Sequence, residues 1–174
     1  MANVLIVIDM QQGVMATERY LAEEKISVMN QLIRAADQVI FIRHSEGEMQ
    51  PGHPSWQIVP ELFQPENALY VSKTACDSFY QTSLAETLAK AGARAFTVCG
   101  CATDYCVDTT IKVGASRGYA ITVAGDAHTT AERSSVTAAQ LIDQHNEVWA
   151  ELTVPGNRLQ VLPANQIISG WQSV

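Results

Sequence analysis

The stretch AFTVCGCATDYCVDTTIKVGASRGYAITV, residues 95–123, carries the pattern that decides the fold. It begins with a short run of apolar and β-branched residues, continues with helical periodicity over Asp104 to Ser116, and ends with a second such run at Ala120 to Val123. Gly118 closes the predicted helix. This order of strand, helix and strand predicts two parallel strands joined by a crossover helix.

The same alternation extends over the rest of the chain. The other predicted strands are Val4 to Ile8, Val39 to Ile42, Leu69 to Val71 and Leu159 to Leu162, and Ala95 to Val98 is the strand that opens the quoted stretch. The other predicted helices are Glu23 to Ala36, Thr82 to Ala91 and Glu132 to Leu152. The sequence therefore predicts an α/β fold, with a parallel sheet and helices on both of its faces.

Length and composition limit the class of protein. A chain of 174 residues predicts one domain over residues 1–174, and a formal net charge of -7 without a run of Lys or Arg makes nucleic acid and membranes poor partners. The amino terminus lacks the pattern of a secretory signal, and no segment is long and apolar enough to span a bilayer. Three of the four cysteines are crowded together, unlike a disulfide framework. We therefore expect a cytoplasmic protein with reduced thiols.

Ligands of a parallel α/β sheet bind beyond the carboxyl ends of its strands. Polar residues directly after an apolar run are thus candidates for a site, and they are Asp9, His44, Lys73, Cys101 and Asp126. The long, proline-rich segment from Ser45 to Asn67 is predicted to be irregular, and either covers the site as a lid or only decorates the surface.

Cys106 is the candidate nucleophile. Residues 100–107, GCATDYCV, follow a predicted strand and open a helix, with Thr103 or Asp104 placed to cap it. The unpaired N–H groups and the dipole at a helix start favour a thiolate and can accept an oxyanion. The alternative is a buried cysteine that only fills space.

Asp9 and Lys73 are the candidate partners of this thiol. Asp9 follows the first strand, where it is placed to shuttle a proton or merely to cap a turn. Lys73 follows the third strand, where its charge would lower the pKa of the cysteine, although a surface lysine is the ordinary alternative. Neither the cysteines nor the histidines have the spacing of a metal site, so no metal is expected.

Residues at strand ends, or next to the candidate triad in the sequence, are also predicted to line the pocket. Its predicted substrate-binding residues are His44, Trp56, Phe79, Tyr105 and His128.

Three motifs together resemble those of the isochorismatase-like cysteine hydrolases. They are Asp9-Met10-Gln11-Gln12-Gly13, Lys73 ahead of Asp77-Ser78-Phe79, and residues 100–107. The resemblance covers nearly the whole chain, and it implies a six-stranded, mainly parallel sheet in a Rossmann-like three-layer sandwich. It also implies a homo-oligomer, a dimer or larger, with sites near subunit interfaces, and no nucleotide cofactor.

The resemblance further implies roles for single residues. It gives a catalytic triad of Asp9, Lys73 and Cys106, and an oxyanion hole from the backbone N–H groups of Ala102 and Cys106. A cis peptide bond characteristic of the family would fall between Cys101 and Ala102.

Departures from the family pattern narrow the expected reaction. The Asp-x-His metal motif of nicotinamidases is replaced by Arg43-His44-Ser45, which argues against a metal-dependent nicotinamidase. Siderophore-pathway isochorismatases commonly lack the cysteine, so the presence of Cys106 favours attack on a carbonyl carbon. We expect hydrolysis of a C–N bond in a small amide or carbamoyl compound through a thioester. An isochorismatase acting on a vinyl ether and a non-catalytic small-molecule binding protein are the alternatives.

Overall fold

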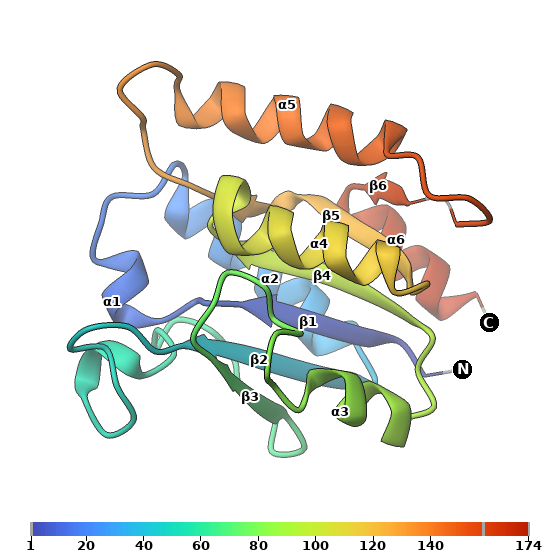
Figure 1. Cartoon of the computed structure of the whole chain (residues 1–174), viewed down its shortest axis with the longest axis horizontal. Coiled ribbons are helices and arrows are strands. Elements are labelled where there is room, and N and C mark those ends of the chain that lie inside the picture. The colour runs from blue at the N-terminus through green and yellow to red at the C-terminus, as the bar shows by residue number, and fades with distance from the viewer. Residues whose placement is uncertain (1, 158, 174) are drawn as a thin grey trace.

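A central six-stranded sheet organises the computed structural model, which describes residues 2–157 and 159–173 (Figure 1). Its strands are β1 (Val4–Ile8), β2 (Gln38–His44), β3 (Leu69–Lys73), β4 (Ala95–Cys101), β5 (Ala120–Thr129) and β6 (Gln160–Leu162). They follow the order β3-β2-β1-β4-β5-β6, and neighbouring strands pair in parallel. The predicted parallel sheet is confirmed.

Helices cover both faces of the sheet (Figure 1). Helices α3 (Leu84–Lys90), α4 (Asp108–Ser116) and α5 (Ala138–Glu151) pack on one face, and α2 (Ala22–Ala35) and α6 (Ala164–Gln172) pack on the other. Alternate residues of a strand point to opposite faces, so Ile6 and Ile8 of β1 enter the first core, and Leu5 and Val7 enter the second. The predicted three-layer α/β sandwich is confirmed.

One long helix, α5, begins later than the sequence predicts. Helix α5 begins at Ala138, six residues after the predicted start at Glu132, because Thr137 and Gln140 form a capping box there. The Glu132 carboxylate accepts a hydrogen bond from the Ala138 N–H at 3.1 Å and so belongs to the cap.

The helix predicted over Asp104 to Ser116 begins as the π-helical turn η2 (Thr103–Val107) and continues as α4. Two short helical segments, α1 (Gln12–Met15) and the 3₁₀ turn η1 (Pro54–Trp56), were absent from the sequence prediction. One turn is too short to show a periodic pattern. Helix α6 was also missed; it is nine residues long and has Gly170 near its end.

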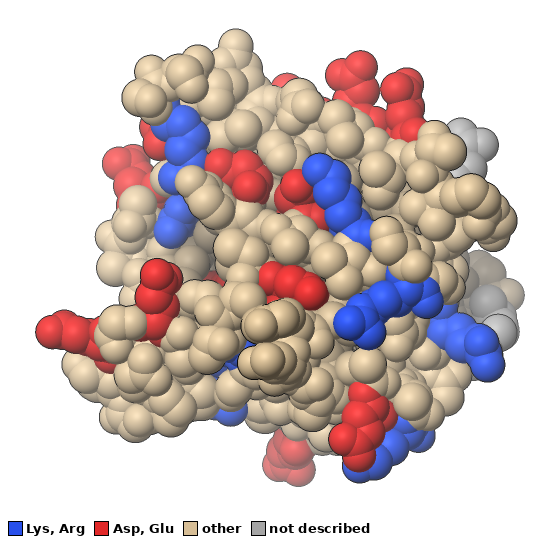
Figure 2. Space-filling model, in the orientation of Figure 1, with Lys and Arg blue, Asp and Glu red and all other residues tan. Residues whose placement is uncertain are grey.

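Charged side chains are mixed on the face of the molecule shown in Figure 2. Lys and Arg lie among Asp and Glu, with uncharged surface between them. This face therefore offers no continuous basic track for a phosphate backbone. In residues 2–157 and 159–173, no helix combines the length and the apolarity needed to cross a bilayer.

The close approach of β1 and β4 predicts a strong effect of one substitution. Gly100 has φ of +126°, and an added Cβ would lie 2.6 Å from the backbone nitrogen of Ile8 and against its carbonyl oxygen. We expect Gly100→Ala to lower the free energy of unfolding by about 3 kcal/mol or more, measured by urea denaturation. Gly170→Ala is the matched control, since open space surrounds its position, and it should change stability by less than about 1 kcal/mol. Equal stability of the two variants would contradict the close packing of Gly100 against the Ile8 backbone.

Candidate active site

Side chains from three strand ends meet at the carboxyl edge of the sheet. Asp9 follows β1, Lys73 ends β3, and Cys106 lies in η2 directly after β4. The Lys73 ammonium is 2.8 Å from the Asp9 carboxylate and donates a hydrogen bond to the Cys106 sulfur at 3.3 Å. The three residues predicted as a triad thus form one contact network.

The Lys73 ammonium is the centre of this network. Its nitrogen also donates to Nδ1 of His44 at 2.9 Å and to the carbonyl oxygen of Ala75 at 3.0 Å, and its side chain is fully buried. Asp9, His44 and Cys106 have the residue types and the mutual distances, within 4.8 Å, of a metal-binding group. The ammonium already contacts all three, so a metal ion here would have to displace Lys73.

Asp9 has one carboxylate oxygen available for a proton. Oδ2 faces Lys73, while Oδ1 is buried and has no hydrogen-bond partner among the described residues. Burial raises the pKa of Asp9, and the nearby Lys73 charge opposes the rise. An unpaired, buried carboxylate oxygen next to a thiol is a good acceptor for the thiol proton.

The surroundings of Cys106 favour its neutral thiol. Burial raises its pKa, the negative charge of Asp9 raises it further, and Lys73 acts in the opposite direction. The sequence predicted a thiolate favoured by the helix start, but desolvation outweighs that effect here. The arrangement therefore requires a base to remove the proton when the thiol reacts.

Backbone hydrogen bonds tie together the turn that carries Cys106. The peptide bond between Cys101 and Ala102 is cis. The Ala102 carbonyl oxygen accepts hydrogen bonds from the N–H groups of Tyr105 and Val107, both at 3.1 Å, which flank Cys106 in the chain. Within the described residues, no backbone carbonyl accepts the N–H of Ala102.

Side chains beyond the triad hold this turn in place. Arg133 binds both carboxylate oxygens of Asp104, at 2.9 and 3.1 Å, and its guanidinium lies 4.9 Å from the centre of the Tyr105 ring. Planar, two-point pairing of this kind fixes direction as well as distance. Arg133 therefore fixes the two residues of η2 that directly precede Cys106.

A cavity of about 360 Å³ opens onto this group of residues. The lining residues are Asp9, Gly13, Val14, Arg19, His44, Glu46, Met49, Cys76, Cys101, Ala102, Tyr105, Cys106 and Arg133. Two of the predicted pocket residues, His44 and Tyr105, are on this wall. Arg19, Met49 and Arg133 were not predicted, because they lie in connecting segments where no strand end marks the position.

Two other predicted pocket residues lie away from the cavity. Trp56 is buried, and the Arg43 guanidinium lies 3.9 Å from the centre of its ring. The indole N–H of Trp56 donates to the Ser45 hydroxyl at 3.0 Å. Phe79 belongs to the core and stacks on Tyr119 at 5.5 Å between ring centroids.

His128, the fifth predicted pocket residue, is buried behind the turn. Its Nδ1 is 2.7 Å from the Thr103 hydroxyl, and its Nε2 is 2.8 Å from the side-chain oxygen of Asn146. Asn146 presents an acceptor, so Nε2 donates. Burial favours the neutral ring, in which Nδ1 accepts from the Thr103 hydroxyl. His128 thus supports the backbone next to Ala102.

Burial of His128 predicts a dependence of stability on pH. Burial lowers its pKa to about 4 in the folded protein, against about 6.5 when unfolded. Above pH 6.5 both states are neutral and stability is complete; below it only the unfolded state takes up the proton. The free energy of unfolding should therefore fall by about 2 kcal/mol between pH 7 and pH 5.

Urea denaturation at the two pH values measures this effect. His128→Gln should remove most of the difference, whereas the control His53→Gln, at an exposed histidine, should keep it. Identical pH dependence in wild type and His128→Gln would show that another group is responsible.

The segment from Ser45 to Asn67 forms part of the cavity wall. Glu46 and Met49 line the cavity, while Ile58 pairs with Gln11 and packs into the core. The buried Gln11 amide nitrogen donates to the carbonyl oxygens of His44 at 2.9 Å and Trp56 at 3.0 Å. The segment is therefore anchored to the sheet on both sides of its exposed tip.

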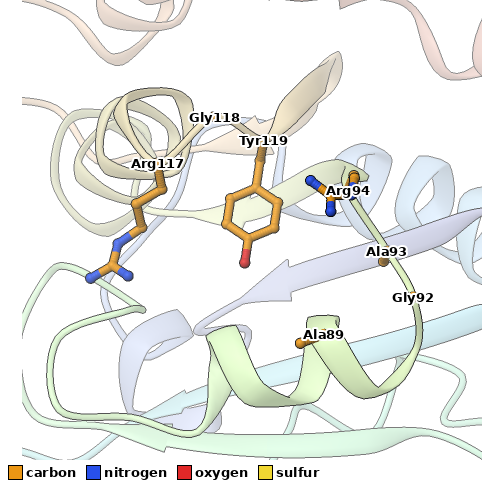
Figure 3. A pocket seen from close by; sticks show the side chains of 7 residues that line it. All are labelled: Ala89, Gly92, Ala93, Arg94, Arg117, Gly118 and Tyr119. Carbon is orange, nitrogen blue, oxygen red and sulfur yellow. The ribbon is translucent and has the colours of Figure 1, made fainter.

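A second hollow, of about 330 Å³, lies at the opposite edge of the sheet (Figure 3). Arg94 and Tyr119 directly precede β4 and β5, and Figure 3 shows Arg94 and Arg117 on either side of Tyr119. Its lining includes neither a cysteine nor a carboxylate. This hollow therefore lacks the nucleophile and the base found at the carboxyl edge.

Comparisons with known proteins agree with this fold. A family model described as the isochorismatase domain matches residues 3–150. The secreted isochorismatase effector Isc1 of Verticillium dahliae is 32% identical over 152 residues, which are 80% of this chain and 79% of that protein. A crystal structure of an isochorismatase family protein has a TM-score of 0.83 at 30% identity, covering 92% of this chain and 97% of the other.

A hydrolase is also among the relatives. The streptothricin hydrolase of Streptomyces noursei is 30% identical over 101 residues, which are 56% of this chain and 40% of that protein. The family match spans most of the sequence, so the chain belongs to the isochorismatase family, and its homologues support a hydrolase that acts on a small molecule.

Proposed function

We propose that this protein is a cysteine hydrolase that cleaves a C–N bond of a small amide or carbamoyl compound. The observation that carries the proposal is the contact of Lys73 with both Asp9 and Cys106, at 2.8 and 3.3 Å, where Asp9 and Cys106 line one cavity. A nucleophile, a base and a cation that stabilises their charges are the groups required for covalent attack on a carbonyl.

The first half of the reaction forms a covalent intermediate. Asp9 takes the thiol proton as the Cys106 sulfur attacks the carbonyl carbon, and the N–H groups of Ala102 and Cys106 receive the developing oxyanion. Asp9 then gives that proton to the leaving nitrogen, the C–N bond breaks, and ammonia or an amine departs. A thioester, or a thiocarbamate from a carbamoyl substrate, remains on Cys106.

The second half restores the enzyme. Asp9 removes a proton from a water molecule, which attacks the thioester carbon, and the C–S bond breaks. The acid product leaves, and the proton returns to the thiol. Throughout, the Lys73 ammonium stabilises whichever of the two partners is negative.

An isochorismatase acting on a vinyl ether is the second candidate. The name of the Verticillium dahliae relative supports it, since that protein is called an isochorismatase effector. The name streptothricin hydrolase, by contrast, states only that this relative hydrolyses streptothricin. The half-buried thiol on the cavity wall favours the covalent route, because cleavage of a vinyl ether needs no nucleophile.

A substrate panel separates the two candidates. We expect wild-type protein to release ammonia from at least one member of a set of primary amides, carbamoyl amino acids and ureido acids. Conversion of isochorismate without ammonia release from any amide would support the vinyl-ether reaction instead. Failure with both kinds of compound would favour a non-catalytic binding protein.

The domain organisation, the oligomeric state and the location in the cell remain predictions. We propose that residues 1–174 act as a single domain, that the protein is a homo-oligomer and that it works in the cytoplasm, although the Verticillium dahliae relative is described as secreted. Sedimentation of the purified protein tests the oligomeric state.

A further inference from the structure

Arg19 is a cation on the cavity wall that the proposed chemistry does not use. It lies in the connection between α1 and α2 and lines the same cavity as Cys106. Its Nε and Nη2 atoms both donate to the carbonyl oxygen of Val14, at 3.0 and 2.8 Å. One edge of the guanidinium is thereby fixed, and the N–H groups of its outer edge are left for another acceptor.

The charge of Arg19 has no counterion in the described part of the chain. No carboxylate lies within 4 Å of it, whereas Arg133, on the same cavity wall, is paired with Asp104 at 2.9 Å. Among the carboxylates that line the cavity, Asp9 is paired with Lys73, and Glu46 is 3.4 Å from His44 with its side chain 82% exposed. Arg19 is therefore an unneutralised positive charge on this wall, in a protein whose net charge is -7.

The backbone next to Arg19 is held in position. The Tyr20 N–H donates to the carbonyl oxygen of Thr130 at 2.9 Å, and the Tyr20 carbonyl oxygen accepts from the Thr129 hydroxyl at 2.6 Å. Thr129 ends β5 and pairs with Cys101 of β4, beside the turn that carries Cys106. The guanidinium is thus preorganised on the same rigid edge as the nucleophile, which reduces the entropy lost when a ligand binds.

The effect of Arg19 on the pKa of Cys101, a neighbouring cysteine, agrees with this placement. Burial raises the pKa of Cys101 to about 12, and the charges of Arg19 and Arg133 act to lower it. The field of Arg19 therefore reaches the end of β4, one residue before Ala102.

We propose that Arg19 binds a carboxylate of the substrate, so that the natural substrates are small amides or carbamoyl compounds that carry a carboxylate away from the bond that is cleaved. The inference rests on the proposed function and specifies its substrate class. A guanidinium edge matches the two oxygens of a carboxylate, and the cavity of about 360 Å³ has the size of a small-molecule site.

Matched pairs of probes test the proposal. The members of each pair share the same primary amide or carbamoyl group, and the other end carries either a carboxylate or a neutral dimethylamide: succinamate against N,N-dimethylsuccinamide, and N-carbamoylglycine against its dimethylamide. Homologues with one to four carbons between the two ends extend the set. Ammonia release gives kcat and KM for wild type, Arg19→Gln, Arg19→Lys and the control Arg34→Gln, which removes an exposed arginine on α2.

We expect wild type to prefer the anionic member of a pair. Arg19→Gln should lower kcat/KM for that member about 10- to 100-fold, mainly through KM, and leave the neutral member nearly unchanged. Arg19→Lys should keep part of the preference because it keeps the charge, and Arg34→Gln should behave as wild type.

The outcomes separate this inference from the proposed function. Hydrolysis of neutral amides alone, or an equal effect of Arg19→Gln on both members of a pair, would overturn the carboxylate site and leave the amide hydrolase standing. Absence of ammonia release from every anionic and neutral probe would overturn both.

Discussion

Replacing Cys106 by alanine should lower turnover roughly 10⁴-fold or more, because the covalent intermediate can no longer form. The fold should survive. The side chain is only half-buried, and the hydrogen bond that its sulfur accepts from Lys73 is long, at 3.3 Å. We expect the free energy of unfolding to change by about 1 kcal/mol or less. Ammonia release and urea denaturation of the same preparation measure the two quantities.

Cys99→Ala is the matched control for this experiment. Cys99 is fully buried in the core, and burial raises the pKa of its thiol, so it is unreactive packing. The control should keep its turnover. Substantial residual activity in Cys106→Ala, with Cys99→Ala unchanged, would rule out the covalent mechanism.

Separating Asp9 from Lys73 should produce the second large effect, on stability as well as on rate. Their side chains are 3% and 0% exposed and 2.8 Å apart. Asp9→Asn leaves a buried ammonium without its anion, and Lys73→Met leaves a buried carboxylate whose Oδ1 already has no partner. Each single variant should lose about 3–5 kcal/mol of stability. Turnover of Asp9→Asn should fall about 10²- to 10⁴-fold, because the general base is gone.

The double variant, Asp9→Asn with Lys73→Met, distinguishes a coupled pair from two independent residues. It removes both charges at once, so its loss of stability should be clearly smaller than the sum of the two single losses. Turnover should stay as low as in Asp9→Asn. Additive losses of stability, measured in urea at pH 7, would show that the two side chains do not depend on each other.

Much of this fold could be predicted from the sequence because its strands are buried on both faces. Such strands appear as short apolar runs, and β1 lies at the predicted residues, Val4–Ile8. The carboxyl ends of parallel strands share one edge, so the approach of Asp9, Lys73 and Cys106 followed from strand order.

Other parts of the site leave little trace in the sequence. The π-helical turn that carries Cys106 depends on hydrogen bonds five residues apart, for which no residue pattern is specific. His128 is the next-to-last residue of β5, yet a register shift between β4 and β5 places it under the turn and not in the cavity. Arg19 lies in a connection whose position is set by contacts with Thr129 and Thr130, more than 100 residues away.

Trapping the covalent intermediate is the sharpest test of the proposed thioester mechanism. Enzyme in excess over a substrate amide is quenched in acid within one turnover, and intact and peptide masses are recorded. We expect a mass increase equal to the substrate less ammonia on the peptide that contains Cys106. Hydroxylamine added during turnover should divert part of the product to the hydroxamate. Ammonia release without an adduct on Cys106 and without hydroxamate would contradict the account.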